Sequence, residues 1–71
     1  MSNKYKWITA TIDSCTGMLR MDYRVEGLDI DGCDNHDEDV STWTDNEIKD
    51  MVQLFLDVPP EHKDMIQVIW D

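Results

Sequence analysis

The chain has very few of the residues that mark small secreted or membrane proteins. Its 71 residues include two cysteines, two prolines and three glycines. Two cysteines are too few for a disulfide framework, so Cys15 and Cys33 are expected to be free thiols in a reducing compartment. No stretch approaches the ~20 apolar residues that span a bilayer, and the first residues lack the apolar core of a signal peptide. We therefore expect a cytoplasmic protein.

Basic residues are also scarce, which limits the possible partners. Six Lys and Arg residues stand against sixteen Asp and Glu residues, and the formal net charge at pH 7 is −10. This charge disfavours direct binding to nucleic acid or to anionic membranes, because both carry the same sign. The sequence also lacks a glycine-rich phosphate loop and a basic stripe with interleaved aromatic residues. Basic protein surfaces are the expected partners.

Most of the negative charge lies between Glu26 and Glu47. This segment holds nine carboxylates and no Lys or Arg, and only His36 could oppose them. Like charges at this density repel one another, so they are usually kept on a solvated or interacting surface. We interpret the segment as an acidic binding face, with a charged surface that only confers solubility as the alternative. The candidate partner-binding residues are Glu26, Asp29, Asp31, Asp34, Asp37, Glu38, Asp39 and Glu47.

Alternating apolar residues predict a hairpin near the start of the chain. Residues 7–13 and 18–25 each place apolar side chains on one face, and Gly17 lies in the turn between them. Matching the two apolar faces determines the register, because a slip of one residue would move every core side chain to the other face. The expected pairs are Ile12 with Leu19, Ala10 with Met21, Ile8 with Tyr23, Thr11 with Arg20 and Trp7 with Arg24.

The acidic segment predicts a short strand followed by a loop. Residues 27–31 alternate and are expected to form an edge strand, and residues at about 32–41 are expected to form an exposed acidic loop. The carboxylates of alternate residues in an extended chain lie about 6.6 Å apart, close to the spacing of phosphates along one DNA strand. Asp29 with Asp31, and Asp37 with Asp39, have this spacing.

The second half of the chain predicts a helix and a final strand. Thr44 and Glu47 form a capping box, apolar residues then recur at helical spacing over 45–57, and Pro59 and Pro60 end the helix. Residues 61–64 are expected to be a connection. Residues 65–70 are so uniformly apolar that we expect a strand covered on both edges.

These elements predict a single α+β domain over residues 1–71. The expected order is β-β-(β)-α-β, with an antiparallel or mixed sheet of three to four strands and one helix packed on a face. The expected core is Ile8, Ile12, Leu19, Met21, Tyr23, Ile48, Val52, Phe55, Ile66, Val68 and Trp70.

Metal binding and catalysis have weaker sequence support than an acidic binding face. Residues 29–39 are rich in the hard oxygen ligands that calcium prefers, but their spacing fails the EF-hand pattern. A zinc site would have to combine Cys33 and His36 with Cys15 and His62, and only the first pair has ligand-like spacing. A catalytic grouping of Cys33, His36 and Asp37 would need a pocket that a domain of this size rarely supplies. We therefore expect no metal, no cofactor and no enzymatic activity.

The acidic segment, the hairpin and the capped helix together resemble the small acidic phage-encoded anti-CRISPR proteins, particularly those that block type I surveillance complexes. This resemblance implies inhibition by DNA mimicry. The acidic face would lie where the complex reads the protospacer-adjacent motif or grips target duplex, on its large subunit, with a type I-C complex as the first candidate and the host bacterial cytoplasm as the location. No residue role is carried over from the family.

Three functions remain open on the sequence. The first is a non-enzymatic inhibitor that competes with DNA for a basic site. The second is an antitoxin or immunity-like protein that blocks the active site of a basic nuclease. The third is a small structural or regulatory phage protein whose acidity is incidental. The oligomeric state is also open, with a monomer expected.

Overall fold

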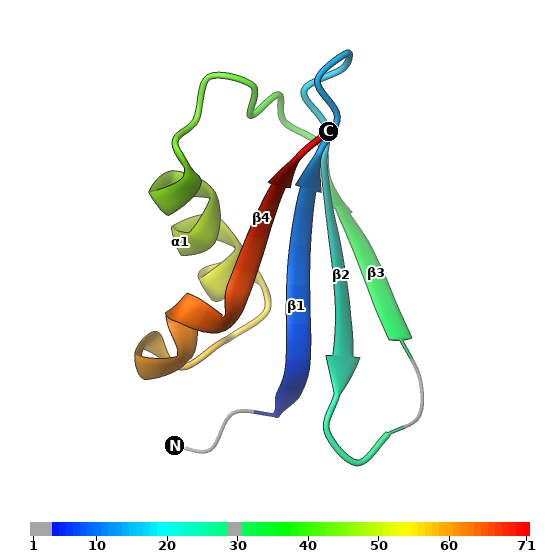
Figure 1. The fold of residues 1–71 in the computed structure, drawn as a ribbon, viewed down its shortest axis with the longest axis vertical. Coiled ribbons are helices and arrows are strands. Elements are labelled where there is room, and N and C mark those ends of the chain that lie inside the picture. Colours follow the sequence, from blue (N-terminus) through cyan, green and yellow to red (C-terminus); the bar gives the residue numbers. More distant parts are fainter. Residues whose placement is uncertain (1–3, 29–30) are drawn as a thin grey trace.

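The computed structural model describes residues 4–28 and 31–71 and contains a four-stranded mixed sheet with one helix packed on it (Figure 1). This α+β fold confirms the predicted class. The strands are β1 (Tyr5–Ile12), β2 (Leu19–Val25), β3 (Asp31–His36) and β4 (Ile66–Trp70), in the spatial order β3-β2-β1-β4. The helices are α1 (Asp45–Phe55) and the short 3-10 helix η1 (Pro60–Met65). Among the described residues, no helix is both long enough and apolar enough to cross a membrane.

The register of the β1–β2 hairpin is as the sequence predicted. Ile12 pairs with Leu19, Ala10 with Met21 and Ile8 with Tyr23, and the two expected pairs on the outer face are also present. Gly17 supports the turn with a φ of 73°, which is unfavourable for a residue with a side chain. A Cβ there would also overlap the carboxylate of Asp39.

The expected boundary between edge strand and loop is wrong. Asp31–His36 forms β3, which pairs antiparallel with β2, so the acidic loop begins only at Asp37. The pairing supplies the backbone hydrogen bonds that a polar segment would otherwise make with water, and this outweighs the low strand propensity of Asp, Gly and Asn. Asp29 and Ile30, on which the expected strand and part of the candidate site depended, lie outside the described residues.

The expectation that the last strand is covered on both edges is also wrong. Within the described part of the chain, β4 pairs with β1 alone, in the parallel direction, and it forms one edge of the sheet. Only Ile66 of this strand is buried, while Ile69 and Trp70 are each 43% exposed. The uniform apolarity of β4 therefore does not reflect burial on all sides.

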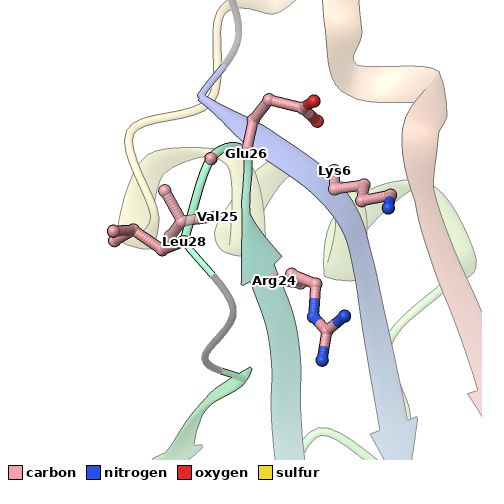
Figure 2. A pocket seen from close by; sticks show the side chains of 6 residues that line it. Lys6, Arg24, Val25, Glu26 and Leu28 are labelled. Atoms are coloured by element: carbon pink, nitrogen blue, oxygen red, sulfur yellow. The ribbon is translucent and has the colours of Figure 1, made fainter.

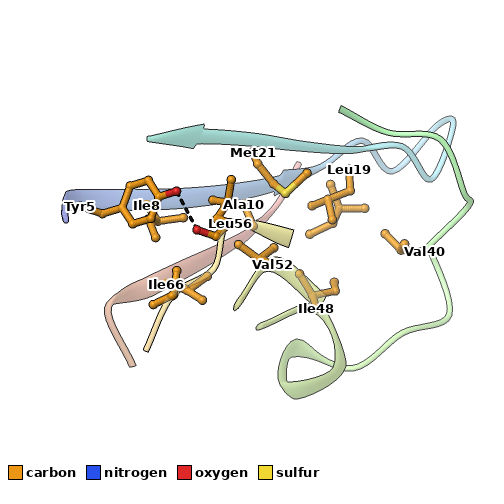
Figure 3. Packing of buried hydrophobic residues seen from close by; sticks show 12 residues of the cluster. Tyr5, Ile8, Ala10, Leu19, Met21, Val40, Ile48, Val52, Leu56 and Ile66 are labelled. Carbon is orange, nitrogen blue, oxygen red and sulfur yellow. Dashed lines mark hydrogen bonds between the residues drawn. The ribbon is translucent and has the colours of Figure 1, made fainter. Parts of the chain in front are cut away.

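The core lies between the helix face of the sheet and α1 (Figure 3). The capping box is present: the Thr44 hydroxyl accepts a hydrogen bond from the Glu47 amide at 3.2 Å, and the Glu47 carboxylate accepts one from the Thr44 amide at 2.9 Å. The helix buries Ile48 and Val52, and Leu56 at its C-cap is buried too. These residues recur at four-residue steps, so one narrow stripe faces the sheet.

Four of the eleven predicted core residues are less buried than expected. Phe55 is 52% exposed because the stripe passes through Leu56 instead, and Trp70 is exposed because it ends an edge strand. Tyr23 and Val68 are half-buried and pack against the core. The core also includes residues that the prediction omitted, namely Tyr5, Ala10, Val40, Leu56 and Val58.

Candidate functional site: an acidic end of the sheet

Several carboxylates converge at one end of the sheet because strands β1, β3 and β4 run in the same direction. The strand pairings place Ile12, Leu19, His36 and Trp70 in one row across the sheet. The residues that directly follow Ile12, His36 and Trp70 therefore leave the sheet at the same end, where Figure 1 also shows the 13–18 turn and the end of the chain. We name this surface the acidic end. It comprises Asp13, Asp37, Glu38, Asp39 and Asp71, and all five residues are exposed.

Backbone hydrogen bonds hold the segments of the acidic end together. The Asp71 amide donates to the Ile12 carbonyl at 2.9 Å, and the Ser14 amide donates to the Asp71 carbonyl at 3.2 Å. The Val40 amide donates to the Gly17 carbonyl at 2.9 Å, and this bond ties the acidic loop to the hairpin turn. Val40 is itself fully buried. The carboxylates are therefore carried on anchored backbone.

Two of the carboxylates accept hydrogen bonds from nearby amides. Asp13 accepts one from the Cys15 amide and Asp39 accepts one from the Ser41 amide, each at 2.8 Å. Hydrogen bonds from the Ser41 side chain and backbone hold the pKa of Asp39 below its ordinary value. Hydrogen bonding to the charged form favours ionisation, so Asp39 is negative at neutral pH.

The start of α1 adds negative charge next to the acidic end. The Trp70 indole donates a hydrogen bond to the Asp45 carboxylate at 2.6 Å, which places the first helical residue beside the end of β4. Glu47 lies in the same helical turn, but its carboxylate is used by the capping box. Of the predicted site residues, Glu47 thus has a structural role in addition to its charge.

Two other predicted site residues, Asp31 and Asp34, lie on opposite faces of the sheet. Side chains alternate along β3, and Asp31 pairs with Arg24 while Asp34 pairs with Met21. The Asp31 carboxylate forms an ion pair with the Arg24 guanidinium at 2.7 Å on the outer face. The Asp34 carboxylate accepts a hydrogen bond from the Tyr23 hydroxyl at 2.9 Å on the helix face. The predicted row of carboxylates is therefore divided, and of the predicted site residues that the structure describes, Asp37, Glu38 and Asp39 reach the acidic end.

Asp34 also changes the chemistry of Tyr23. The hydrogen bond from the phenol to Asp34 raises the pKa of Tyr23 above its ordinary value, and burial adds to this effect. The Tyr23 ring lies against Gly32, where a Cβ would overlap it, and contacts the Tyr5 ring edge-to-face with centroids 5.4 Å apart. These contacts explain why the polar strand β3 keeps its place on β2.

The opposite end of the sheet carries basic side chains. Figure 2 shows Lys6 and Arg24 on neighbouring strands, with Glu26 and Leu28 at the turn beyond them. These residues line a hollow of about 250 Å³ together with Val25 and Gly27. Glu26, the first of the predicted site residues, is therefore separated from the acidic end by the length of the hairpin. Lys6 and Arg24 therefore lie at the end of the sheet away from the acidic end.

The described residues bring together no cluster of metal ligands. Within residues 4–28 and 31–71, no three His, Cys, Asp or Glu side chains gather closely enough to hold a metal ion. Cys15 and Cys33 are free and exposed. His36 packs near the Trp43 ring, with centroids 6.0 Å apart, and its Nε2 lies 3.9 Å from the Glu38 carboxylate without a hydrogen-bond partner.

Comparison with known proteins does not assign the chain to a group. No protein-family model matches it, no curated protein matches its sequence, and no solved structure matches its fold. The interpretation of the acidic end therefore depends on its own geometry and charge.

The sequence analysis missed Asp13 and Asp71 because they lie outside the acidic segment. The signal that could have found them is positional: each directly follows an apolar strand, and parallel strands end on the same side of a sheet. Using that signal would have required knowing that β4 pairs with β1.

Proposed function

We propose that this protein is a non-enzymatic inhibitor that occupies a basic, nucleic-acid-binding site on another protein. The acidic end would take the place of a nucleic-acid backbone. The target that we favour is a type I CRISPR surveillance complex, where the acidic end would block the site on the large subunit that recognises target DNA. The protein would then act in the bacterial cytoplasm as an anti-CRISPR protein.

The observation that carries this proposal is the convergence of five exposed carboxylates from three separate segments. Within residues 4–28 and 31–71, none of the five forms an ion pair with Lys or Arg. Arg20, the nearest Lys or Arg in the strand register, is paired with Asp22 at 3.2 Å. The charge of the acidic end is therefore available to an external partner.

The physical consequence is a competitive and salt-sensitive interaction. A groove lined with Lys and Arg attracts this surface by the same Coulomb forces that attract phosphates. Association should be fast at low ionic strength and should weaken as salt screens the exposed charges. Because both would need the same basic groove, inhibitor and DNA should exclude each other.

The first experiment identifies the partner. Immobilised protein is incubated with bacterial lysate, and bound material is eluted separately with ~0.5 M salt and with excess duplex DNA. The expected result is capture of a DNA-binding complex that both treatments release. A captured nuclease that duplex DNA fails to release would instead favour the immunity-like alternative.

The second experiment tests the acidic end with matched charge variants. The double variant Asp37→Lys and Glu38→Lys reverses two carboxylates that form neither a cap nor a turn contact. The control, Glu26→Lys and Asp57→Lys, makes the same change in net charge at exposed positions away from the acidic end. Each variant is titrated into purified type I-C complex bound to labelled target duplex, and the DNA released is measured.

We expect the acidic-end variant to need at least about tenfold more protein to release the DNA, a loss of ~1.4 kcal/mol, and the control to stay within about twofold of wild type. Circular dichroism must show that both variants are folded. Equal inhibition by the folded acidic-end variant and the wild type would rule out the proposed mimicry. Asp31 and Asp34 are unsuitable for this test because their ion pair and hydrogen bond support β3.

A further inference from the structure

The two edges of the sheet differ sharply in charge. β3, at one edge, contains Asp31 and Asp34, and Asp37 follows it directly. β4, at the other edge, has the sequence IQVIW over five residues and contains no charged side chain. Natural proteins usually protect an exposed edge strand with charges, prolines or bulges, because its unpaired backbone groups can bind another strand. β3 has such protection and β4 does not.

The β4 edge also lies beside a groove. A hollow of about 390 Å³ runs between the first turns of α1 and the residues around the start of β4. Asp45 and Lys49 line its helix side, and Asp64 to Val68 line its sheet side. Figure 1 shows β4 on the side of the sheet opposite β3, next to α1. A strand added along β4 would present alternate side chains to this groove.

We propose that the β4 edge binds an extended segment of a partner protein by strand addition, and that this segment is apolar or β-branched in its middle and basic at its ends. Backbone hydrogen bonds to Ile66–Trp70 would supply the pairing, which is a common mode of peptide recognition. Ile69 and Trp70, each 43% exposed, would be covered on the two faces of the enlarged sheet.

Charge complementarity at the two ends of the β4 edge selects a segment with basic ends as the occupant. Asp64 lies just before the strand and Asp71 directly follows it, so a carboxylate flanks each end of the β4 edge. Lys or Arg at both ends of the added segment would face these carboxylates. A second copy of the chain is disfavoured, because an antiparallel pair centred on Val68 would bring Asp71 of each copy next to Asp64 of the other. Two chains with a net charge of −10 would also repel each other.

The β4 edge shares Asp71 with the acidic end, but this inference does not depend on what the acidic end binds. A partner could use both surfaces, but the strand-addition site is tested with a peptide alone and needs no nucleic-acid-binding protein. If the peptide does not bind, the proposed competition with DNA is not contradicted. If the protein does not compete with DNA, the proposed strand addition at β4 is not contradicted.

The probe is a synthetic peptide of about seven residues with lysine at each end and alternating valine and threonine between them. Binding is followed by NMR, through the hydrogen-exchange rates of backbone amides in ¹⁵N-labelled protein. We expect the peptide to slow exchange in β4 and to leave β3 unchanged. A version of the peptide with N-methyl groups on alternate residues should not bind, because it lacks the donors needed for strand pairing.

The matched variants are Ile69→Lys and Asn35→Lys. Both sites are exposed outer-face positions on an edge strand, the first on β4 and the second on β3. Ile69→Lys should weaken peptide binding at least about tenfold by placing positive charge beside the basic segment, and Asn35→Lys should change it less than about twofold.

Three outcomes would overturn the inference. The first is no peptide binding to the wild type. The second is equal binding by the wild type and the folded Ile69→Lys variant. The third is a wild-type dimer in analytical ultracentrifugation whose β4 amides are already protected without peptide, because a second copy would then be the occupant.

Discussion

At the scale of single residues, hydrogen bonds determine which carboxylates remain available for binding. Asp31, Asp34 and Glu47 were grouped with the others by charge alone, yet each has a specific partner in the fold. Asp37 and Glu38 lie in the loop after β3, and the Glu38 carboxylate lies 3.9 Å from Nε2 of His36. A charge map of the sequence therefore overstates the number of carboxylates that can face a partner.

Asp39 gives a prediction about pH. Its pKa in the folded protein is lowered by hydrogen bonds from Ser41, so between the folded and the ordinary value the unfolded chain binds more protons. The stabilising contribution of Asp39 is thus fully present above about pH 4 and is lost as the pH falls through the lower, folded value. The Asp39→Asn variant should therefore lose less unfolding free energy than the wild type on acidification. The Asp37→Asn variant, in the same loop, should lose as much as the wild type.

The measurement is the free energy of unfolding in urea at neutral pH and at about pH 3, together with an NMR titration of the Asp39 carboxyl carbon. If the Asp39 carboxyl titrates at or above its ordinary value, the Ser41 contacts do not stabilise its charged form and the prediction is wrong.

At the scale of secondary-structure elements, α1 begins at a capping box that also uses one of the candidate site residues. Thr44→Ala removes the acceptor for the Glu47 amide and should cost about 1 kcal/mol of stability. Thr42→Ala is the matched control, because Thr42 is exposed in the same loop but precedes the cap. Urea unfolding of both variants measures the difference. Equal stabilities of the two variants would mean that the capping hydrogen bond stabilises the fold no more than a hydrogen bond to water does.

The β3 segment shows why element boundaries depended on the tertiary structure. Its sequence, DGCDNH, has low strand propensity, and a solvated loop was the reasonable expectation. The pairing with β2, the fit of the Tyr23 ring over Gly32 and the hydrogen bond to Asp34 outweigh that propensity. None of these contacts is local in sequence.

At the scale of the whole molecule, the large net negative charge should make stability depend on ionic strength. The net charge of −10 repels itself in the folded state, and salt screens this repulsion between exposed groups. Raising sodium chloride from about 0.02 to 0.5 M should raise the melting temperature, by roughly the 4 to 8 °C that ~1 kcal/mol represents in so small a domain.

The Asp37→Lys and Glu38→Lys variant is the control for this effect, because it has less charge to screen and should show a smaller rise. Circular dichroism at increasing salt measures both proteins. A melting temperature that falls with salt would mean that ion pairs such as Arg24 with Asp31 contribute more than the repulsion.

The sequence by itself determined the features that depend on neighbours in the chain. Alternating apolar residues determined the hairpin and its register, because a slip would expose the core face, and Thr44 with Glu47 determined where α1 begins. Composition determined the acidity, and the order of the predicted strands and helix determined the fold class. Only the tertiary structure decided that β4 pairs with β1 as an edge strand, since many strand orders satisfy the same apolar pattern. That pairing brings Asp71 to the same end of the sheet as Asp13, because parallel strands end on the same side.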